Sequence, residues 1–167
     1  MSGVIVRQAV AADLDDLAEL FDQYRRFQGQ PGALQAARDF LRARFDHGES
    51  VIFIAQAAGA ALGFAQLYPS FSSVSLARVF ILNDLYVAAA GRRRGVATRL
   101  LAAVERHAWS FGAVRITLNV AQDNLQAQAL YEARQWQRDG QFFMYHRFAA
   151  AGAAAASTAV DGEAEGS

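Results

Sequence analysis

The chain has 167 residues, enough for one domain with a substantial core and too few for two ordinary domains. Its 16 Lys and Arg residues balance 16 Asp and Glu residues, so no net charge draws it to nucleic acid or to a membrane surface. It contains no cysteine, which excludes disulfides, thiolate metal ligands and a cysteine nucleophile.

The N-terminal part of the chain predicts one strand followed by two helices. Residues 4–10 (VIVRQAV) are rich in branched side chains and are expected to form the strand. In residues 11–27 apolar side chains recur at helical spacing, with Asp13 as the expected N-cap, and residues 33–45 repeat that pattern after a GQPG break. No basic segment precedes a long apolar run, so we expect a soluble, cytoplasmic protein without a membrane partner.

The rest of the chain predicts a hairpin and then alternating helices and strands. Residues 50–56 and 61–71 are expected to form the hairpin, and residues 78–87 (RVFILNDLYV) have the strongest strand composition. Further elements are a helix from Gly95, a strand at 114–120, a helix at 124–135 and a final strand at 142–148. This order predicts an α/β fold around a mixed sheet.

The C-terminal residues differ in composition from the rest of the chain. Residues 149–167 contain small and acidic residues but no large apolar side chain, so they cannot bury enough surface to offset their ordering entropy. We therefore expect one domain over residues 1–148 and a disordered, Ala-rich acidic tail over residues 149–167.

The segment GRRRGVAT (residues 91–98) lies between the strongest strand and a helix. A glycine-rich turn that opens a helix exposes unpaired amides and the positive end of the helix dipole, which predicts an anion site. The spacing of its glycines fits neither the P-loop nor the dinucleotide fingerprint. A solvated helix end is the alternative interpretation. A nucleic-acid patch is disfavoured because no second basic cluster or stacking platform accompanies the arginines.

Two motifs resemble the GNAT superfamily of N-acetyltransferases. Arg92, Gly95 and Ala97 fit its acetyl-coenzyme A loop, which has Arg or Gln, two residues, Gly, one residue, then Gly or Ala. A later stretch fits its second motif through Leu118, Val120, Asn124, Ala127, Tyr131 and Glu132. The resemblance implies a mixed, mostly antiparallel twisted sheet of six to seven strands, flanked by about four helices and splayed at the strand preceding the cofactor loop. It also implies a homodimer.

The resemblance implies a site for acetyl-coenzyme A, with coenzyme A as product. The Val87 amide is expected to stabilise the oxyanion, and Tyr131 to act as the acid for the departing thiolate, although a core tyrosine with a satisfied hydroxyl is the alternative. The expected cofactor-binding residues are Leu85, Tyr86, Val87, Arg92, Arg93, Arg94, Gly95, Val96, Ala97, Thr98, Asn119, Asn124, Ala127 and Tyr131. One departure is Gln135, where the family usually has glycine, so the helix should end differently.

Asp84 is the candidate residue on the acceptor side. A carboxylate in an apolar strand is costly without a partner, so it could hold an ammonium group or relay its proton. Pairing with Arg78 or with a backbone group is the alternative. By alternation Asp84 shares a face with Leu82 and Tyr86, unless a bulge intervenes.

Aromatic side chains are the other candidates for the acceptor side. Tyr24, Phe27, Tyr68 and Phe71 could line the acceptor pocket, although aromatic residues at such positions more often belong to the core. The three histidines lack metal-ligand spacing, so no metal is expected.

Together these features predict an acetyl-coenzyme A-dependent N-acetyltransferase (EC 2.3.1 class) in which an amine attacks directly. The segments at residues 67–87 and 130–148 resemble the polyamine and histone-type branch, which implies a small cationic primary amine as the acceptor. Acetylation of a protein lysine or N-terminus remains an alternative. So does an acyl-coenzyme A sensor or scaffold without transfer activity.

Overall fold

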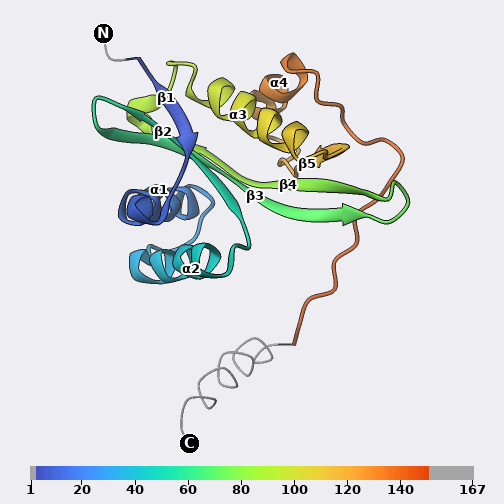
Figure 1. The fold of residues 1–167 in the computed structure, drawn as a ribbon, viewed down its shortest axis with the longest axis horizontal. Helices are drawn as coiled ribbons and strands as arrows, with labels where there is room; N and C mark the ends of the chain where they lie inside the picture. The colour runs from blue at the N-terminus through green and yellow to red at the C-terminus, as the bar shows by residue number, and fades with distance from the viewer. Residues whose placement is uncertain (1–2, 151–167) are drawn as a thin grey trace, which may run out of the picture. The chain divides into compact units, whose positions relative to one another are not determined.

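The central feature of the fold is a single sheet. The computed structural model describes residues 3–150, in which five strands lie in the order β1-β2-β3-β4-β5 (Figure 1). The strands are β1 (Ile5–Gln8), β2 (Val51–Ala57), β3 (Ala60–Ser72), β4 (Ala77–Val87) and β5 (Arg115–Thr117). The first four pair antiparallel, and β5 runs parallel to β4. The predicted mixed, mostly antiparallel α/β fold is thus confirmed.

Three of the helices cover the two faces of this sheet. The helices are α1 (Leu14–Phe27), α2 (Leu34–His47), α3 (Val96–Ser110) and α4 (Leu125–Ala133). Helices α1 and α2 lie on one face and α3 on the other (Figure 1). In the described part of the chain, no helix is long and apolar enough to cross a membrane.

The predicted strand count of six to seven is wrong for the described residues. The strand expected over residues 114–120 extends only over Arg115–Thr117, and residues 142–148 form no strand. The chain divides into two compact units, Met1–Leu130 and Tyr131–Ser167, and the described part of the second contains no strand with which residues 142–148 could pair. A lone strand has no backbone hydrogen bonds to stabilise it. The predicted tail lies almost wholly outside the described residues.

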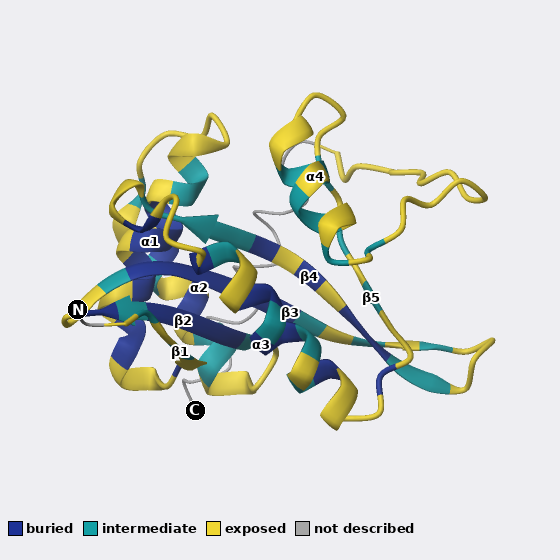
Figure 2. Cartoon of the chain, turned by 90° about the horizontal axis from the view of Figure 1, so that it is seen from above, coloured by how far each residue is buried: buried dark blue, intermediate teal, exposed yellow. Residues whose placement is uncertain are grey.

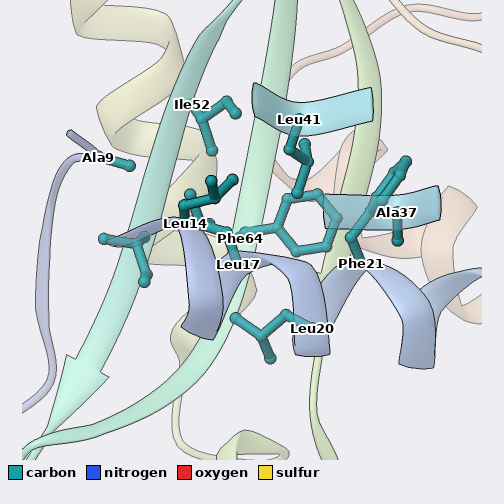
Figure 3. Close-up of a cluster of buried hydrophobic side chains, with 10 residues drawn as sticks. Ala9, Leu14, Leu17, Leu20, Phe21, Ala37, Leu41, Ile52 and Phe64 are labelled. Atoms are coloured by element: carbon teal, nitrogen blue, oxygen red, sulfur yellow. The ribbon is translucent and has the colours of Figure 1, made fainter. Parts of the chain in front are cut away.

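The core of the first unit lies where α1 and α2 pack on the sheet. Figure 3 shows a cluster of buried hydrophobic side chains from α1, α2 and the sheet. Phe64 of β3 belongs to this cluster and is 1% exposed. The ring of Phe64 meets those of Phe21 and Tyr24 edge-on, with centroids 6.0 Å away in each case. Figure 2 shows that burial extends along β2 and much of β3. The sheet therefore gives the residues on β3 and β4 a rigid support.

The start of α1 differs in detail from the expectation. Asp13 is the N-cap residue, as predicted, but its side chain makes no hydrogen bond to the first turn of α1. The carboxylate instead accepts the Val10 amide at 2.8 Å and both terminal nitrogens of Arg7 at 2.7 Å. This pairing joins β1 to the turn before α1.

A β-bulge at Asn83 decides which way Asp84 faces. Leu82 lies opposite Leu67 and Asp84 opposite Gln66, so Asn83 is the extra residue on β4. Because cross-strand partners share a face and adjacent residues alternate, Leu82 and Asp84 face opposite sides of the sheet. The simple alternation that placed them on one face is therefore wrong, and the bulge is the reason.

Strands β4 and β5 separate beyond their short region of pairing. Their register runs only from Val79 opposite Arg115 to Ile81 opposite Thr117. From Leu82 to Val87, β4 has β3 as its only strand neighbour within the described residues. This is the predicted splay before the glycine-arginine loop, and it leaves one backbone edge of β4 open.

Candidate active site

The loop after β4 presents unpaired amides at the start of α3. Gly95 is the N-cap, with a left-handed φ of 69° that suits glycine because it has no Cβ. The first helical hydrogen bond runs from the Arg99 amide to the Gly95 carbonyl at 3.1 Å. The preceding amides of the first turn therefore lack helical acceptors. A Cβ at Gly95 would meet nothing within 4 Å, so there is open space beside the N-cap of α3.

Two further glycines bring this loop close to the sheet. A Cβ at Gly91 would lie 2.9 Å from the Leu62 carbonyl oxygen, and one at Gly63 would lie 2.6 Å from the Tyr86 carbonyl oxygen. Only glycine permits both approaches. The side chains of Arg92, Arg93 and Arg94 are exposed around the loop, and the φ of Arg93 is 60°. The three exposed arginines thus belong to a turn that packs closely against the end of the sheet and opens α3.

The open edge of β4 carries a backbone donor beside the loop. The Ala88 amide donates to the Leu62 carbonyl of β3 at 2.9 Å. Since amides alternate sides along a strand, the Val87 amide points away from β3, toward the edge that β5 does not cover. Leu85 and Tyr86, the other expected residues on this segment, are half-buried.

Asp84 is a buried carboxylate with neutral hydrogen-bond partners. It is 5% exposed and accepts from Gln66 Nε2 at 2.8 Å and from Asn83 Nδ2 at 3.2 Å. Tyr24 of α1 also interacts with the carboxylate and favours its charged form. Burial raises the pKa of the Asp84 carboxyl, and these hydrogen bonds oppose that rise. No salt bridge found among the described residues includes Asp84.

Arg78 is not the partner of Asp84. Its guanidinium lies over the ring of Phe71 at 4.9 Å and is 5.9 Å from the centroid of the Phe80 ring. The alternative of an Asp84–Arg78 pair is therefore wrong. The bulge explains this result, because it turns Asp84 to the face that carries Gln66.

Aromatic rings surround the Asp84 side of the sheet. The ring of Tyr86 lies 6.0 Å from that of Tyr24 and 6.3 Å from that of Phe27, centroid to centroid. Tyr68 is on the same face of β3 as Gln66. The pKa of the Tyr68 hydroxyl is raised, mainly by burial and to a smaller extent by the negative charge of Asp84. The structure therefore brings Tyr24, Phe27 and Tyr68 to the face of Asp84.

Phe71 does not belong to this group. It is 70% exposed and lies opposite Arg78 toward the end of the β3–β4 hairpin. The sequence reasoning also missed three polar residues beside Asp84, namely Ser50, Gln66 and Asn83. Gln66 could have been found by the argument that identified Asp84, because it too is a polar residue within an apolar strand.

The second motif lies at the start of α4 and in the second unit. Asn124 Oδ1 accepts the Ala127 amide at 3.1 Å, so Asn124 caps the helix. Asn119 is exposed and lies beyond the end of β5. In the second unit the ring of Tyr131 packs against that of Trp136 at 5.8 Å, and burial raises the pKa of its hydroxyl. Gln135 adopts a φ of 66°, the left-handed conformation that glycine would take.

Comparison with known proteins gives a consistent result. The profile of the Acetyltransferase (GNAT) family matches residues 14–135. The chain is 45% identical over 140 residues to "Uncharacterized N-acetyltransferase YhfO" of Bacillus subtilis (strain 168), covering 84% of this chain and 94% of that protein.

Solved structures extend the comparison to the fold. A crystal structure described as "a probable acetyltransferase" is 42% identical with a TM-score of 0.83, covering 87% of this chain and 98% of its own. Aminoglycoside N-acetyltransferase AAC(6')-Iy in complex with CoA is 25% identical with a TM-score of 0.73. The match covers 88% of this chain and 96% of that protein's chain. By family match, identity and fold, the chain belongs to the GNAT superfamily of N-acetyltransferases.

Proposed function

We propose that this N-acetyltransferase moves an acetyl group from acetyl-coenzyme A to a small cationic primary amine held at Asp84. The observation that carries the proposal is the burial of a carboxylate whose contacts are all to neutral groups. A buried anion without a cation is costly, and an ammonium group placed against it would offset that cost. The rings of Tyr24, Phe27 and Tyr86 suit the same ligand, because cations bind to aromatic faces.

The loop residues fit the pyrophosphate of coenzyme A. The amides from Gly95 to Thr98 lie at a helix N-terminus, where an anion is favoured, and there is open space beside Gly95. Arg92, Arg93 and Arg94 would add charge-assisted hydrogen bonds to phosphate oxygens. Acetyl-coenzyme A supplies the activated thioester when bound. The Val87 amide, at the open edge of β4, would donate to the carbonyl oxygen of that thioester.

Asp84 has two tasks in this proposal. An alkylamine has a pKa near 10.4 and is therefore protonated at neutral pH, so it must lose a proton before it can attack. Asp84 would first hold the ammonium group and then accept its proton, directly or through water. Because burial raises the pKa of Asp84, the carboxylate is a better proton acceptor than an exposed aspartate.

Tyr131 is the proposed acid. Burial raises the pKa of its hydroxyl, so the side chain keeps its proton at neutral pH and can donate it to the departing sulfur. Asn124 and Ala127 are proposed to contact coenzyme A together with Tyr131, and Asn119 to contribute from the segment after β5.

The amine class rests on the charge at Asp84 and on one comparison. AAC(6')-Iy is named an aminoglycoside N-acetyltransferase, and aminoglycosides are cationic amines. We extend this class of acceptor to the present chain, with protein lysines and N-termini as the other acceptors to be tested. We also propose a cytoplasmic homodimer whose acetyltransferase domain spans residues 1–148.

The experiment is an amine screen with two readouts. The purified protein is incubated with acetyl-coenzyme A and a panel of diamines, aminoglycosides, amino acids and lysine peptides, and free thiol is measured together with the acetylated product. Thermal stabilisation by acetyl-coenzyme A is measured in parallel, and ligand at 100 times Kd should stabilise the fold by about 2.7 kcal/mol. Binding without transfer to any amine would favour the sensor or scaffold alternative.

A further inference from the structure

A buried chain of hydrogen bonds ends on the Asp84 carboxylate. Ser50 Oγ donates to Gln66 Oε1 at 2.9 Å, and Gln66 Nε2 donates to Asp84 Oδ2 at 2.8 Å. Gln66 is 0% exposed, so bulk water does not reach its amide. Gln66 and Asp84 lie opposite each other on the paired strands β3 and β4, and Ser50 is the residue before β2.

The chemistry of these groups fixes the direction of the chain. An ionised carboxylate only accepts hydrogen bonds, so Gln66 must turn its Nε2 toward Asp84. Its Oε1 then faces Ser50, whose hydroxyl must donate. If the amide turned over, Oε1 would face the carboxylate and the donor would be lost. The carboxylate, which can only accept, therefore sets the orientation of Gln66, and the Ser50 hydroxyl satisfies Gln66 Oε1 in that orientation.

We propose that Gln66, whose Oε1 is satisfied by Ser50, is a positioning residue that holds the Asp84 carboxylate charged and in one orientation for the acceptor amine. This inference rests on the proposed function. Gln66 acts through Asp84 and touches neither the amine nor coenzyme A in this account. Its strand position supports the role, since the bulge at Asn83 sets Asp84 directly opposite Gln66.

Other titratable groups near Asp84 lie on each element that packs around it. Tyr24 approaches from α1, and Tyr86 is two residues further along β4. Tyr68 of β3 interacts with Asp84, and also with Arg44 of α2 and Glu49 just beyond it. Burial is the main cause that raises the pKa of Asp84, and the Gln66 hydrogen bond is the largest cause that lowers it. Loss of the Gln66 donor should therefore make Asp84 harder to ionise.

The test replaces each member of the chain and follows Asp84 itself. Gln66→Met removes the donor to Asp84 while keeping a similar shape, and Ser50→Ala removes the donor to Gln66 Oε1. Ser50→Thr keeps a hydroxyl and should preserve wild-type behaviour. Gln56→Met is the matched control, because Gln56 is on β2 and bonds to Arg7 instead. The carboxyl titration of Asp84 is recorded by carbon NMR without substrate, and kcat/KM for the amine is measured against pH.

We expect Gln66→Met to move the midpoint of the Asp84 titration to higher pH, by on the order of half a pH unit or more. The acidic limb of the plot of kcat/KM against pH should move in the same direction by a similar amount. Ser50→Ala should shift both in the same direction by less, and KM for acetyl-coenzyme A should not change. At pH 7 kcat/KM should fall about fivefold or more in Gln66→Met.

Two results would overturn the inference. One is an unchanged Asp84 titration in a folded Gln66→Met protein, or in Ser50→Ala if the first variant does not fold. The other is a shifted titration with an unchanged pH profile, which would make the hydrogen bond structural. If the wild-type protein transfers no acetyl group, the proposed function fails, and the titration still decides whether Gln66 and Ser50 control the charge of Asp84.

Discussion

Gln66 on β3 donates a hydrogen bond from its Nε2 to the buried carboxylate of Asp84 on β4 at 2.8 Å, and Tyr24 on α1 interacts with the same carboxylate. A helix near the N-terminus and a strand 60 residues later thus build one face of the candidate acceptor site. Asn83 Nδ2 donates to this carboxylate as well, and all three of these partners are neutral. The arrangement prepares a negative charge for a cationic ligand.

Asp84→Asn should abolish most transfer without unfolding the protein. We expect kcat/KM for the amine to fall by about 10²–10³-fold, as is typical when a positioned proton acceptor is lost. Because burial raises the pKa of Asp84, its charge opposes folding at neutral pH, and thermal stability should be equal or higher in the variant. Steady-state kinetics and a thermal melt at pH 7 check both parts. Asp16→Asn, an exposed position on α1, should change neither.

Gly95→Glu should prevent binding of acetyl-coenzyme A. The new carboxylate would enter the open space beside the N-cap of α3 and repel a phosphate. Gly112→Glu is the matched control, since Gly112 has a φ of 73°, also has open space, and follows the C-terminal end of α3. Both variants carry the same backbone strain. Calorimetric binding lost in both, or in neither, would contradict the assignment of the loop.

Tyr131→Phe should slow the chemical step. If the hydroxyl donates a proton to the departing thiolate, kcat should fall on the order of 10²-fold while the Kd of acetyl-coenzyme A stays within about twofold. Tyr145→Phe, at an exposed tyrosine of the same unit, should have no effect. Full activity in Tyr131→Phe, with an amine that the wild type accepts, would show that Tyr131 is instead an aromatic packing residue.

Asp13→Ala should reveal a pH-dependent contribution to stability. Hydrogen bonds from Arg7 keep the pKa of Asp13 below its ordinary value, so the unfolded state binds protons more readily. The stabilisation is therefore present above the unfolded pKa, near 3.9, and is lost as pH falls through the lower folded pKa. We expect Asp13→Ala to cost about 1–3 kcal/mol at pH 7 and less at acidic pH.

The control for that experiment is Asp15→Ala, which removes an exposed carboxylate bonded to Arg38 at 2.7 Å. Exposed pairs contribute little, so this variant should cost less than about 1 kcal/mol. Urea unfolding across pH distinguishes the two positions. An equal loss in both variants at every pH would show that the Arg7–Asp13 pair has no special role.

The glycine-arginine loop and Asp84 could be predicted because each depends on local sequence. Gly95 stands where a helix must begin in the left-handed conformation, and a motif of six residues is enough to mark it. Asp84 stood out as a charge in an apolar strand. Tyr24 and Phe27 were candidates only as aromatic residues, and the tertiary fold is what brings them beside Tyr86.

The bulge and the absence of the expected final strand could not be predicted, because strand pairing depends on distant segments of the chain. The sequence around Asn83 does not show that Gln66 will pair with Asp84. This register determines which face of the sheet Asp84 occupies. Residues 142–148 have high strand propensity, but a strand also needs a neighbour to bond with. In the structure their large side chains are exposed, including Phe143 at 89% and Tyr145 at 90%.

The central claim is acetyl transfer to an amine that Asp84 holds. The most direct measurement is release of coenzyme A thiol from acetyl-coenzyme A with the amine panel, comparing wild type with Asp84→Asn at matched acetyl-coenzyme A saturation. The account predicts amine-dependent thiol release by the wild type, greatest with cationic primary amines, and a loss of about 10²-fold or more in the variant. Equal rates in the two proteins, or release that no amine stimulates, would contradict it.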